Sequence, residues 1–152
     1  MRSVVGFLFF LLFLAGLFLV FLQGRQMTGQ IATSGGAELS GVRWRPTYIG
    51  PEPVPEDAGL WVQFEIDGGI VGHAGCNSFF GSLRQTDEGI EVGALGSTRM
   101  ACAEPVMSRE SAFLSALGQA TLFEVSGERM NSLDADRRLL VEFAASEIPA
   151  DE

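Results

Sequence analysis

The stretch "GHAGCNSFFGS", Gly72–Ser82, and its counterpart "STRMACAEP", Ser97–Pro105, together decide the fold. Each half contains one of the only two cysteines in the chain, Cys76 and Cys102. An isolated pair of cysteines in an exported domain is typically oxidised, and closing a loop of this size stabilises a domain by roughly 3 kcal/mol. Buried free thiols and a redox or nucleophilic cysteine are the alternatives, although no C-x-x-C motif supports redox chemistry. We therefore predict a structural disulfide between Cys76 and Cys102.

Glycines surround the first cysteine and invite comparison with a phosphate-binding loop, because Gly72, Gly75 and Gly81 follow a predicted strand. A phosphate-binding loop leads into a helix whose N-terminus faces the phosphates, whereas "NSFFGSL" is aromatic and strand-like. Backbone geometry explains the glycines better, with left-handed conformations at Gly75 and Asn77 on either side of Cys76.

His73 is the only histidine, and "HAGC" places it three positions before Cys76. With Cys102 these residues offer three soft ligands, but zinc needs a fourth ligand or a water, and nothing else in the chain clusters as a ligand set. His73 would also have to be the base of any Ser–His–acid triad, yet no G-x-S-x-G turn is present. We predict no metal, no cofactor and no catalytic residue, with a surface or hairpin histidine as the simplest interpretation.

Aromatic residues mark a possible interaction surface. Phe79 and Phe80 cannot both face inward on a regular strand, so they indicate a bend or an exposed aromatic side chain. Tyr48, Trp61 and Phe80 are the candidates for exposed aromatics, and a place in the core is the alternative for each.

Directly after Met1-Arg2-Ser3 the chain has the run "VVGFLFFLLFLAGLFLVFL", Val4–Leu22, which has no polar side chain. This length is close to the roughly 20 residues that a helix needs to cross a bilayer. A cleaved signal peptide has a shorter apolar region, about 7–15 residues, and an A-x-A-like site that is missing here. We predict an uncleaved signal anchor in residues 1–24; a cleaved signal peptide and a buried core helix are the alternatives.

Charge restricts the partners and leaves the orientation open. Arg2 and Arg25 flank the apolar run on opposite sides, so we adopt the usual orientation of a single N-terminal anchor. The expected location is the inner membrane, single-pass, with the C-terminal domain in the periplasm.

The chain has no lysine, and it has 10 arginines against 19 acidic residues. This acidity argues against nucleic-acid binding and opposes tight adsorption to an anionic membrane surface.

Residues 25–41 are rich in Gly, Ser and Thr and are expected to form a flexible linker, followed by a folded domain at 42–144 and an acidic tail at 145–152. In the domain, "LWVQFEI", Leu60–Ile66, alternates with period two and predicts a half-buried strand with Ile66 on the buried face. "DGG" then predicts a hairpin turn, and a second hairpin is expected around Asp87–Gly89. The proline-rich "PEPVPEDAG" excludes a helix and predicts an exposed loop.

One helix is predicted, starting near Pro105 and stopping at Gly118. Its apolar stripe consists of Val106, Phe113, Leu114 and Leu117. Beyond it, "TLFEV", "RMNSL" and "LLVEF" predict three closing strands joined by turns at 126–128 and 134–137. The fold class is α+β, dominated by antiparallel strands with one main helix packed against them.

These motifs resemble the META domain, also called the heat-shock protein HslJ family. The family pattern is G-x-x-G-C-N-x-F-x-G, a spacer, T-x-M-A-C, then a glutamate-containing helix and two or three closing strands. The resemblance covers Val42 to Phe143, with departures at "WRPTYI" in the opening strand and at "MNSL" in a closing strand. The matching positions are Gly72, Gly75, Cys76, Asn77, Phe79, Gly81, Thr98, Met100, Ala101, Cys102, Glu110 and Leu117.

The resemblance implies a curved antiparallel sheet packed on a helix, in bacterial envelope proteins associated with stress or drug tolerance. It implies no catalytic residue and no cofactor. The leading hypothesis is a non-enzymatic, membrane-tethered module that binds a protein or another envelope component. The alternatives are a thiol-dependent redox or hydrolytic enzyme using Cys76 or Cys102 with His73, and a structural accessory to secretion or to a complex.

Overall fold

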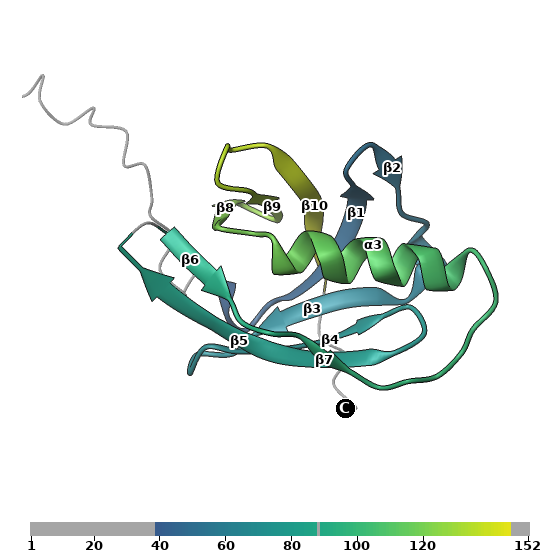
Figure 1. Ribbon diagram of the computed structural model, residues 1–152. Helices are drawn as coiled ribbons and strands as arrows, with labels where there is room; N and C mark the ends of the chain where they lie inside the picture. The colour runs from purple at the N-terminus through teal and green to yellow at the C-terminus, as the bar shows by residue number, and fades with distance from the viewer. Residues whose placement is uncertain (1–38, 88, 147–152) are drawn as a thin grey trace, which may run out of the picture. The chain divides into compact units, whose positions relative to one another are not determined.

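The computed structural model describes residues 39–87 and 89–146, in which an antiparallel sheet curves around one helix (Figure 1). Along its main path the strand order is β6-β5-β4-β3-β1-β10-β9-β8, with β2 paired to β1 and β7 paired to β5. The predicted α+β class is confirmed. The elements are β1 (Arg43–Ile49), β2 (Glu52–Pro53), the 3-10 turn η1 (Glu56–Ala58), β3 (Leu60–Phe64), β4 (Gly69–Ala74), β5 (Ser78–Thr86), β6 (Gly89–Val92), β7 (Gly96–Ser97), α3 (Val106–Gly118), β8 (Leu122–Ser126), β9 (Arg129–Leu133) and β10 (Leu139–Ser146).

The β3–β4 hairpin forms where "DGG" predicts it, but β3 is shorter than expected. The turn starts at Glu65, whose N–H donates to the Gly69 carbonyl at 2.8 Å. Asp67 adds a side-chain acceptor for the Gly69 N–H at 3.0 Å. These bonds draw the chain out of the sheet after Phe64, so Ile66 lies in the turn and is 93% exposed. The predicted burial of Ile66 is therefore wrong.

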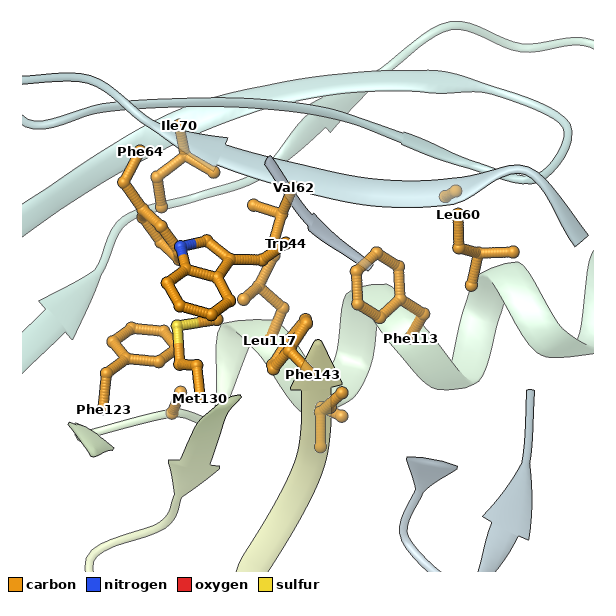
Figure 2. Packing of buried hydrophobic residues seen from close by; sticks show 14 of the residues in the cluster. Trp44, Leu60, Val62, Phe64, Ile70, Phe113, Leu117, Phe123, Met130 and Phe143 are labelled. Atoms are coloured by element: carbon orange, nitrogen blue, oxygen red, sulfur yellow. The ribbon is translucent and has the colours of Figure 1, made fainter. Parts of the chain in front are cut away.

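The helix α3 supplies one side of the core, and the concave face of the sheet supplies the other (Figure 2). Of the predicted stripe, Phe113 and Leu117 are fully buried, while Val106 and Leu114 are half-buried. The Phe113 ring makes edge-on contacts with Phe79 and Phe143, at centroid distances of 5.8 and 6.2 Å. The helix is thereby joined to β5 on one side and to β10 on the other.

The chain enters the fold earlier than the composition suggests. Leu39 is only 1% exposed, and its carbonyl accepts a hydrogen bond from the buried Trp44 indole at 3.1 Å. Ser40 bridges to Phe64 at the end of β3. Leu39 and Ser40 thus pack with the domain, although the sequence places them in the linker.

The predicted anchor, Val4–Leu22, lies outside the described residues. Within residues 39–87 and 89–146, no helix has the length and apolar character needed to cross a membrane.

The three predicted closing strands are confirmed as β8, β9 and β10, including the atypical "MNSL", in which Met130 and Ser132 are fully buried. The two ends of the strand order, β6 and β8, come close together. The Ile90 N–H of β6 donates to the carbonyl of Thr121, the residue just before β8, at 2.9 Å. The proline-rich segment differs slightly from its prediction: one 3-10 turn, η1, forms directly after Pro55, the last of its prolines.

The β9–β10 turn depends on a single carboxylate. The Oδ1 of Asp134 accepts hydrogen bonds from the backbone N–H groups of Asp136 and Arg138, at 2.9 Å each. The bond from the Arg138 backbone, aided by the Arg138 guanidinium, lowers the pKa of Asp134 below its ordinary 3.8. Arg137 takes the left-handed conformation that closes the turn, with φ at 59°.

Candidate functional site

The two halves of the motif meet through a disulfide. Cys76 lies in the turn between β4 and β5, and Cys102 lies in the segment between β7 and α3. Their Sγ atoms are 2.06 Å apart and their Cα atoms 6.0 Å apart. Cys76 is buried and Cys102 is exposed. The predicted disulfide is confirmed, and the described residues contain no free cysteine.

Asn77, itself buried, is the centre of a hydrogen-bond network directly beside the disulfide. Its Oδ1 accepts bonds from the Thr98 hydroxyl at 2.8 Å and from the Met100 N–H at 2.7 Å. Its Nδ2 donates to the Met100 carbonyl at 3.2 Å and to Glu110 at 2.8 Å. One side chain therefore joins the start of β5, the segment that carries Cys102, and the helix α3.

Glu110 completes this network from α3. One carboxylate oxygen accepts the Asn77 backbone N–H at 2.8 Å, and the other accepts the Asn77 side-chain amide. Glu110 is only 6% exposed. A buried carboxylate is stable when donors satisfy it, and hydrogen bonds to a charged group are stronger than those between neutral groups. The pair thus fastens α3 to the β4–β5 turn.

The sequence named Asn77 and Glu110 only as motif positions and did not predict that they pair. A signal for the glutamate was present, because Glu110, Phe113 and Leu117 have the spacing of a single helix face. A carboxylate on the apolar face of a helix requires a buried donor, and Asn77 provides it.

The glycines of the motif serve two purposes. Gly75 has a φ of 99°, as predicted. Asn77 does not: among the described residues, Arg137 is the only non-glycine with positive φ, so the left-handed assignment of Asn77 is wrong. Asn77 is needed for its amide. At Gly72 a β-carbon would overlap the Trp61 carbonyl oxygen and the Phe79 ring, so this position requires close packing rather than special φ.

The remaining motif residues complete this structural picture. Phe79 is buried against α3, whereas the side chains of Met100 and Ala101 are exposed. The ring of Phe80 lies next to Gly96, and Leu95 lies next to Gly81, so the 95–96 segment approaches β5 closely at both glycines. These contacts hold the 95–96 segment against β5, next to the hydrogen bonds that Asn77 makes.

His73 lies on the outer face of β4, half-buried, with Trp61 and Ser78 as its cross-strand partners. Its Nδ1 is 3.1 Å from the Gly75 N–H donor and 3.1 Å from the Gly59 carbonyl oxygen. Nδ1 can therefore donate to the Gly59 carbonyl when it carries a hydrogen, or accept from the Gly75 N–H when it does not. Across residues 39–87 and 89–146, no three His, Cys, Asp or Glu side chains gather as a possible metal site.

The three candidate surface aromatics all point away from the core but do not form one cluster. Phe80 on β5 is 64% exposed and Tyr48 near the end of β1 is 44% exposed. Trp61 on β3 is half-buried, with the Arg43 guanidinium 4.1 Å from its ring centre. The strand β4 separates Trp61 from Phe80, and Tyr48 follows an irregularity in β1 that begins at Pro46.

A shallow groove of about 260 Å³ lies between the β1–β2 region and the first turns of α3. Its walls are mostly apolar, with Arg109 as the cation and Glu52 as the anion. The one hydroxyl among its lining residues, on Ser108, donates to the Pro105 carbonyl at 3.0 Å. The lining residues are Ile49, Glu52, Pro53, Val54, Pro105, Ser108, Arg109 and Ala112.

Comparison with known proteins agrees with this architecture. A family model described as "META domain" matches residues 37–147. An NMR structure of a protein from Burkholderia xenovorans has a TM-score of 0.61 and 25% identity, covering 76% of this chain and 89% of that one. A second NMR structure has a TM-score of 0.58 and 19% identity, covering 72% and 93%.

A crystal structure of a DUF4847 family protein from Bacteroides vulgatus shares the fold, with a TM-score of 0.55 and 14% identity over 75% of this chain and 99% of that one. No curated protein matches the chain.

Proposed function

The chain belongs to the META domain family, and from this premise we propose that it is a non-enzymatic binding module of the bacterial cell envelope. In this proposal Val4–Leu22 anchors it in the inner membrane and places residues 39–146 in the periplasm. The module binds an envelope component through the outer face of its sheet and contributes to tolerance of envelope stress.

The observation that carries the non-enzymatic assignment is the closed network around Asn77. The most distinctive polar residues of the motif, Asn77, Thr98 and Glu110, are hydrogen-bonded to one another or to backbone, and the groove of about 260 Å³ is lined by other residues. A catalytic group must be able to reach a substrate. These residues instead hold three segments in place.

The alternative thiol-dependent enzyme finds less support. It requires a thiolate, whereas the sulfurs of Cys76 and Cys102 are bonded to each other. Thiol titration of the denatured, unreduced protein distinguishes the two: we expect no reactive thiol, and one would favour the enzyme.

The tether and its orientation are tested on the full chain with a C-terminal tag. We expect the protein to stay with membranes through carbonate extraction and to be digested by protease added to spheroplasts. A chain that lacks residues 1–24 is the control and should be released. Protection of the tag from external protease would contradict the periplasmic location.

The role in stress tolerance is tested by deletion of the gene. We expect lower survival under detergent or oxidative stress, restored by the full chain. A chain in which residues 1–24 are replaced by a cleavable signal peptide should restore survival poorly, because it is no longer concentrated at the membrane. Equal survival of the deletion strain and its parent would argue against this role.

A further inference from the structure

We propose that the segment from Thr98 to Cys102 binds in the active site of a serine protease that cleaves after arginine, and that it inhibits this protease. Arg99 enters the acidic pocket that selects arginine, and the Arg99–Met100 peptide bond lies at the catalytic serine. The inference goes beyond the proposed function, because it concerns a loop rather than the outer face of the sheet and does not depend on the tether.

The segment between β7 and α3 presents its side chains to solvent (Figure 1). Residues 98–105 belong to no helix or strand, and every one of them is exposed. Met100 is 57% exposed although its side chain is apolar. Exposed loops on a rigid scaffold are where proteins most often carry recognition residues. The side chains of this segment are therefore free to contact a partner.

The backbone of the same segment is held from behind by one buried side chain. Asn77 is only 2% exposed, and its amide bonds both the N–H and the carbonyl of Met100, at 2.7 and 3.2 Å. The Thr98 hydroxyl donates to this amide as well, and the Thr98 N–H donates to the Ser78 carbonyl at 3.0 Å. A loop that is already fixed loses little conformational entropy on binding, which is a condition for tight binding.

These contacts leave the backbone of Arg99 and Ala101 open to a partner. The N–H and the carbonyl of one residue point to the same side in an extended chain, and those of its neighbours point to the opposite side. Met100 turns both groups inward, and no backbone hydrogen bond joins Arg99 or Ala101 to another described residue. A serine protease pairs with its substrate as with an added strand and holds the carbonyl before the cleaved bond in its oxyanion hole.

Arg99 supplies the charge that selects the partner. Its side chain is exposed and forms no hydrogen bond or ion pair with another described residue. By contrast, Arg84, Arg137 and Arg138 are each paired with a carboxylate. An acidic pocket defines the proteases that cleave after basic residues, and a guanidinium forms strong hydrogen bonds with a carboxylate. The available cation thus lies directly before the residue whose backbone is held most firmly.

The contacts on both sides of the Arg99–Met100 bond explain why the protein inhibits the protease rather than being degraded. The protease serine Oγ forms an ester with the Arg99 carbonyl carbon, and the bond to the Met100 nitrogen breaks. The serine proton passes through the protease histidine to that nitrogen. Asn77 keeps the new amine in place, and the disulfide joins the part of the chain with Cys76 to the part with Cys102. An amine held this close to the ester re-forms the peptide bond before water replaces it.

Inhibition is measured with the full chain in mild detergent, against trypsin and chymotrypsin acting on small chromogenic substrates. We expect inhibition of trypsin at nanomolar to micromolar concentration and none of chymotrypsin. Arg99→Ala should weaken the inhibition of trypsin on the order of a hundredfold, as expected when a central anchor residue is removed. Arg129→Ala removes an exposed arginine from β9 and is the matched control, which should inhibit as well as the unchanged chain.

A change of specificity separates recognition by Arg99 from a structural role. Arg99→Lys should keep the inhibition of trypsin, because lysine also fits an acidic pocket. Arg99→Phe should lose it and should inhibit chymotrypsin instead, because that protease has an apolar pocket. Position 99 is exposed, so we expect each variant to fold, and near-UV circular dichroism verifies this.

Mass spectrometry of the chain after incubation with trypsin completes the test. Slow cleavage between Arg99 and Met100, with both parts joined by the disulfide and still inhibitory, would support the inference. Rapid cleavage there with loss of inhibition would make the segment a substrate and refute it. The inference also fails if the unchanged chain does not inhibit trypsin at micromolar concentration, or if Arg99→Ala inhibits trypsin equally well.

Discussion

Asn77 shows how the chemistry of one side chain determines a motif position. Its Nδ2 group donates to Glu110 and to the Met100 carbonyl, while its Oδ1 accepts from Thr98 and from the Met100 N–H. Aspartate would present a second carboxylate to Glu110, and serine would be too short to reach both sides. This position requires a side chain that has an N–H donor at one end and an oxygen acceptor at the other, and the asparagine amide provides both.

Glu110→Gln should lower the free energy of unfolding by about 2 kcal/mol. The substitution replaces a carboxylate oxygen that accepts an Asn77 N–H by an amide that donates, so two donors face each other in a buried site. Urea unfolding followed by circular dichroism measures the loss. Glu124→Gln is the control, because the Glu124–Arg137 ion pair is exposed and such pairs contribute at most about 1 kcal/mol. Equal losses in both variants would mean that the network contributes little.

Gly72→Ala should destabilise the domain much more than Gly81→Ala. A β-carbon at position 72 meets backbone at the Trp61 carbonyl, which cannot move without breaking the β3–β4 pairing, whereas at 81 the nearest atom is a terminal methyl of Leu95. Overpacking costs about 1–3 kcal/mol and more when the backbone must shift, so we expect about 3 kcal/mol or more at 72 and about 1 kcal/mol at 81. The urea midpoints of the two variants give the comparison, and the reverse order would refute this packing explanation.

At the scale of elements, the segment from β7 to α3 has little regular structure of its own and is fastened from outside. The disulfide holds it at Cys102, and Asn77 holds it at Thr98 and Met100. Both fasteners start from adjacent residues, Cys76 and Asn77, at the beginning of β5. The segment in turn sets the starting position of α3, which supplies Phe113 to the core.

The Cys76→Ala/Cys102→Ala variant should therefore remain folded but lose about 3 kcal/mol of stability. The loss follows from the chain entropy that the closed loop removes from the unfolded state. Thermal unfolding measures it, and amide exchange should show that the Met100 N–H keeps some protection through Asn77. Collapse of the whole spectrum to that of an unfolded chain would mean that the polar network cannot hold the segment alone.

At the scale of the whole molecule, the curved sheet closes its core only with help from both ends of the described chain. The β10 strand pairs with β1, and Leu39 packs with the core while accepting the Trp44 indole hydrogen bond. Helix α3 fills the concave side that this curvature creates (Figure 1). The start of the domain is therefore a packing position rather than the end of a linker.

Leu39→Ala should lower the free energy of unfolding by about 3 kcal/mol, the usual effect of removing a buried leucine side chain. Leu139→Ala, at a position that is 40% exposed, is the comparison and should cost much less. Chemical denaturation of both variants provides the measurement. If Leu39→Ala were no worse than Leu139→Ala, the domain would begin at Val42, as its composition suggests.

The amino-acid sequence by itself determined the main strands, the helix and which cysteines can pair, because strand alternation, "DGG" and the Pro105–Gly118 pattern are local signals and two cysteines allow only one pairing. It also identified Asn77 and Glu110 as motif positions. The tertiary structure decided that the two cysteines are bonded and added β2, β7 and η1. It also decided why Asn77 and Glu110 matter, why Gly72 must lack a side chain, and that Ile66 is exposed while Leu39 is buried. Those outcomes depend on which atoms meet across segments that are distant in the chain, and spacing within one segment does not show which distant residue a side chain contacts.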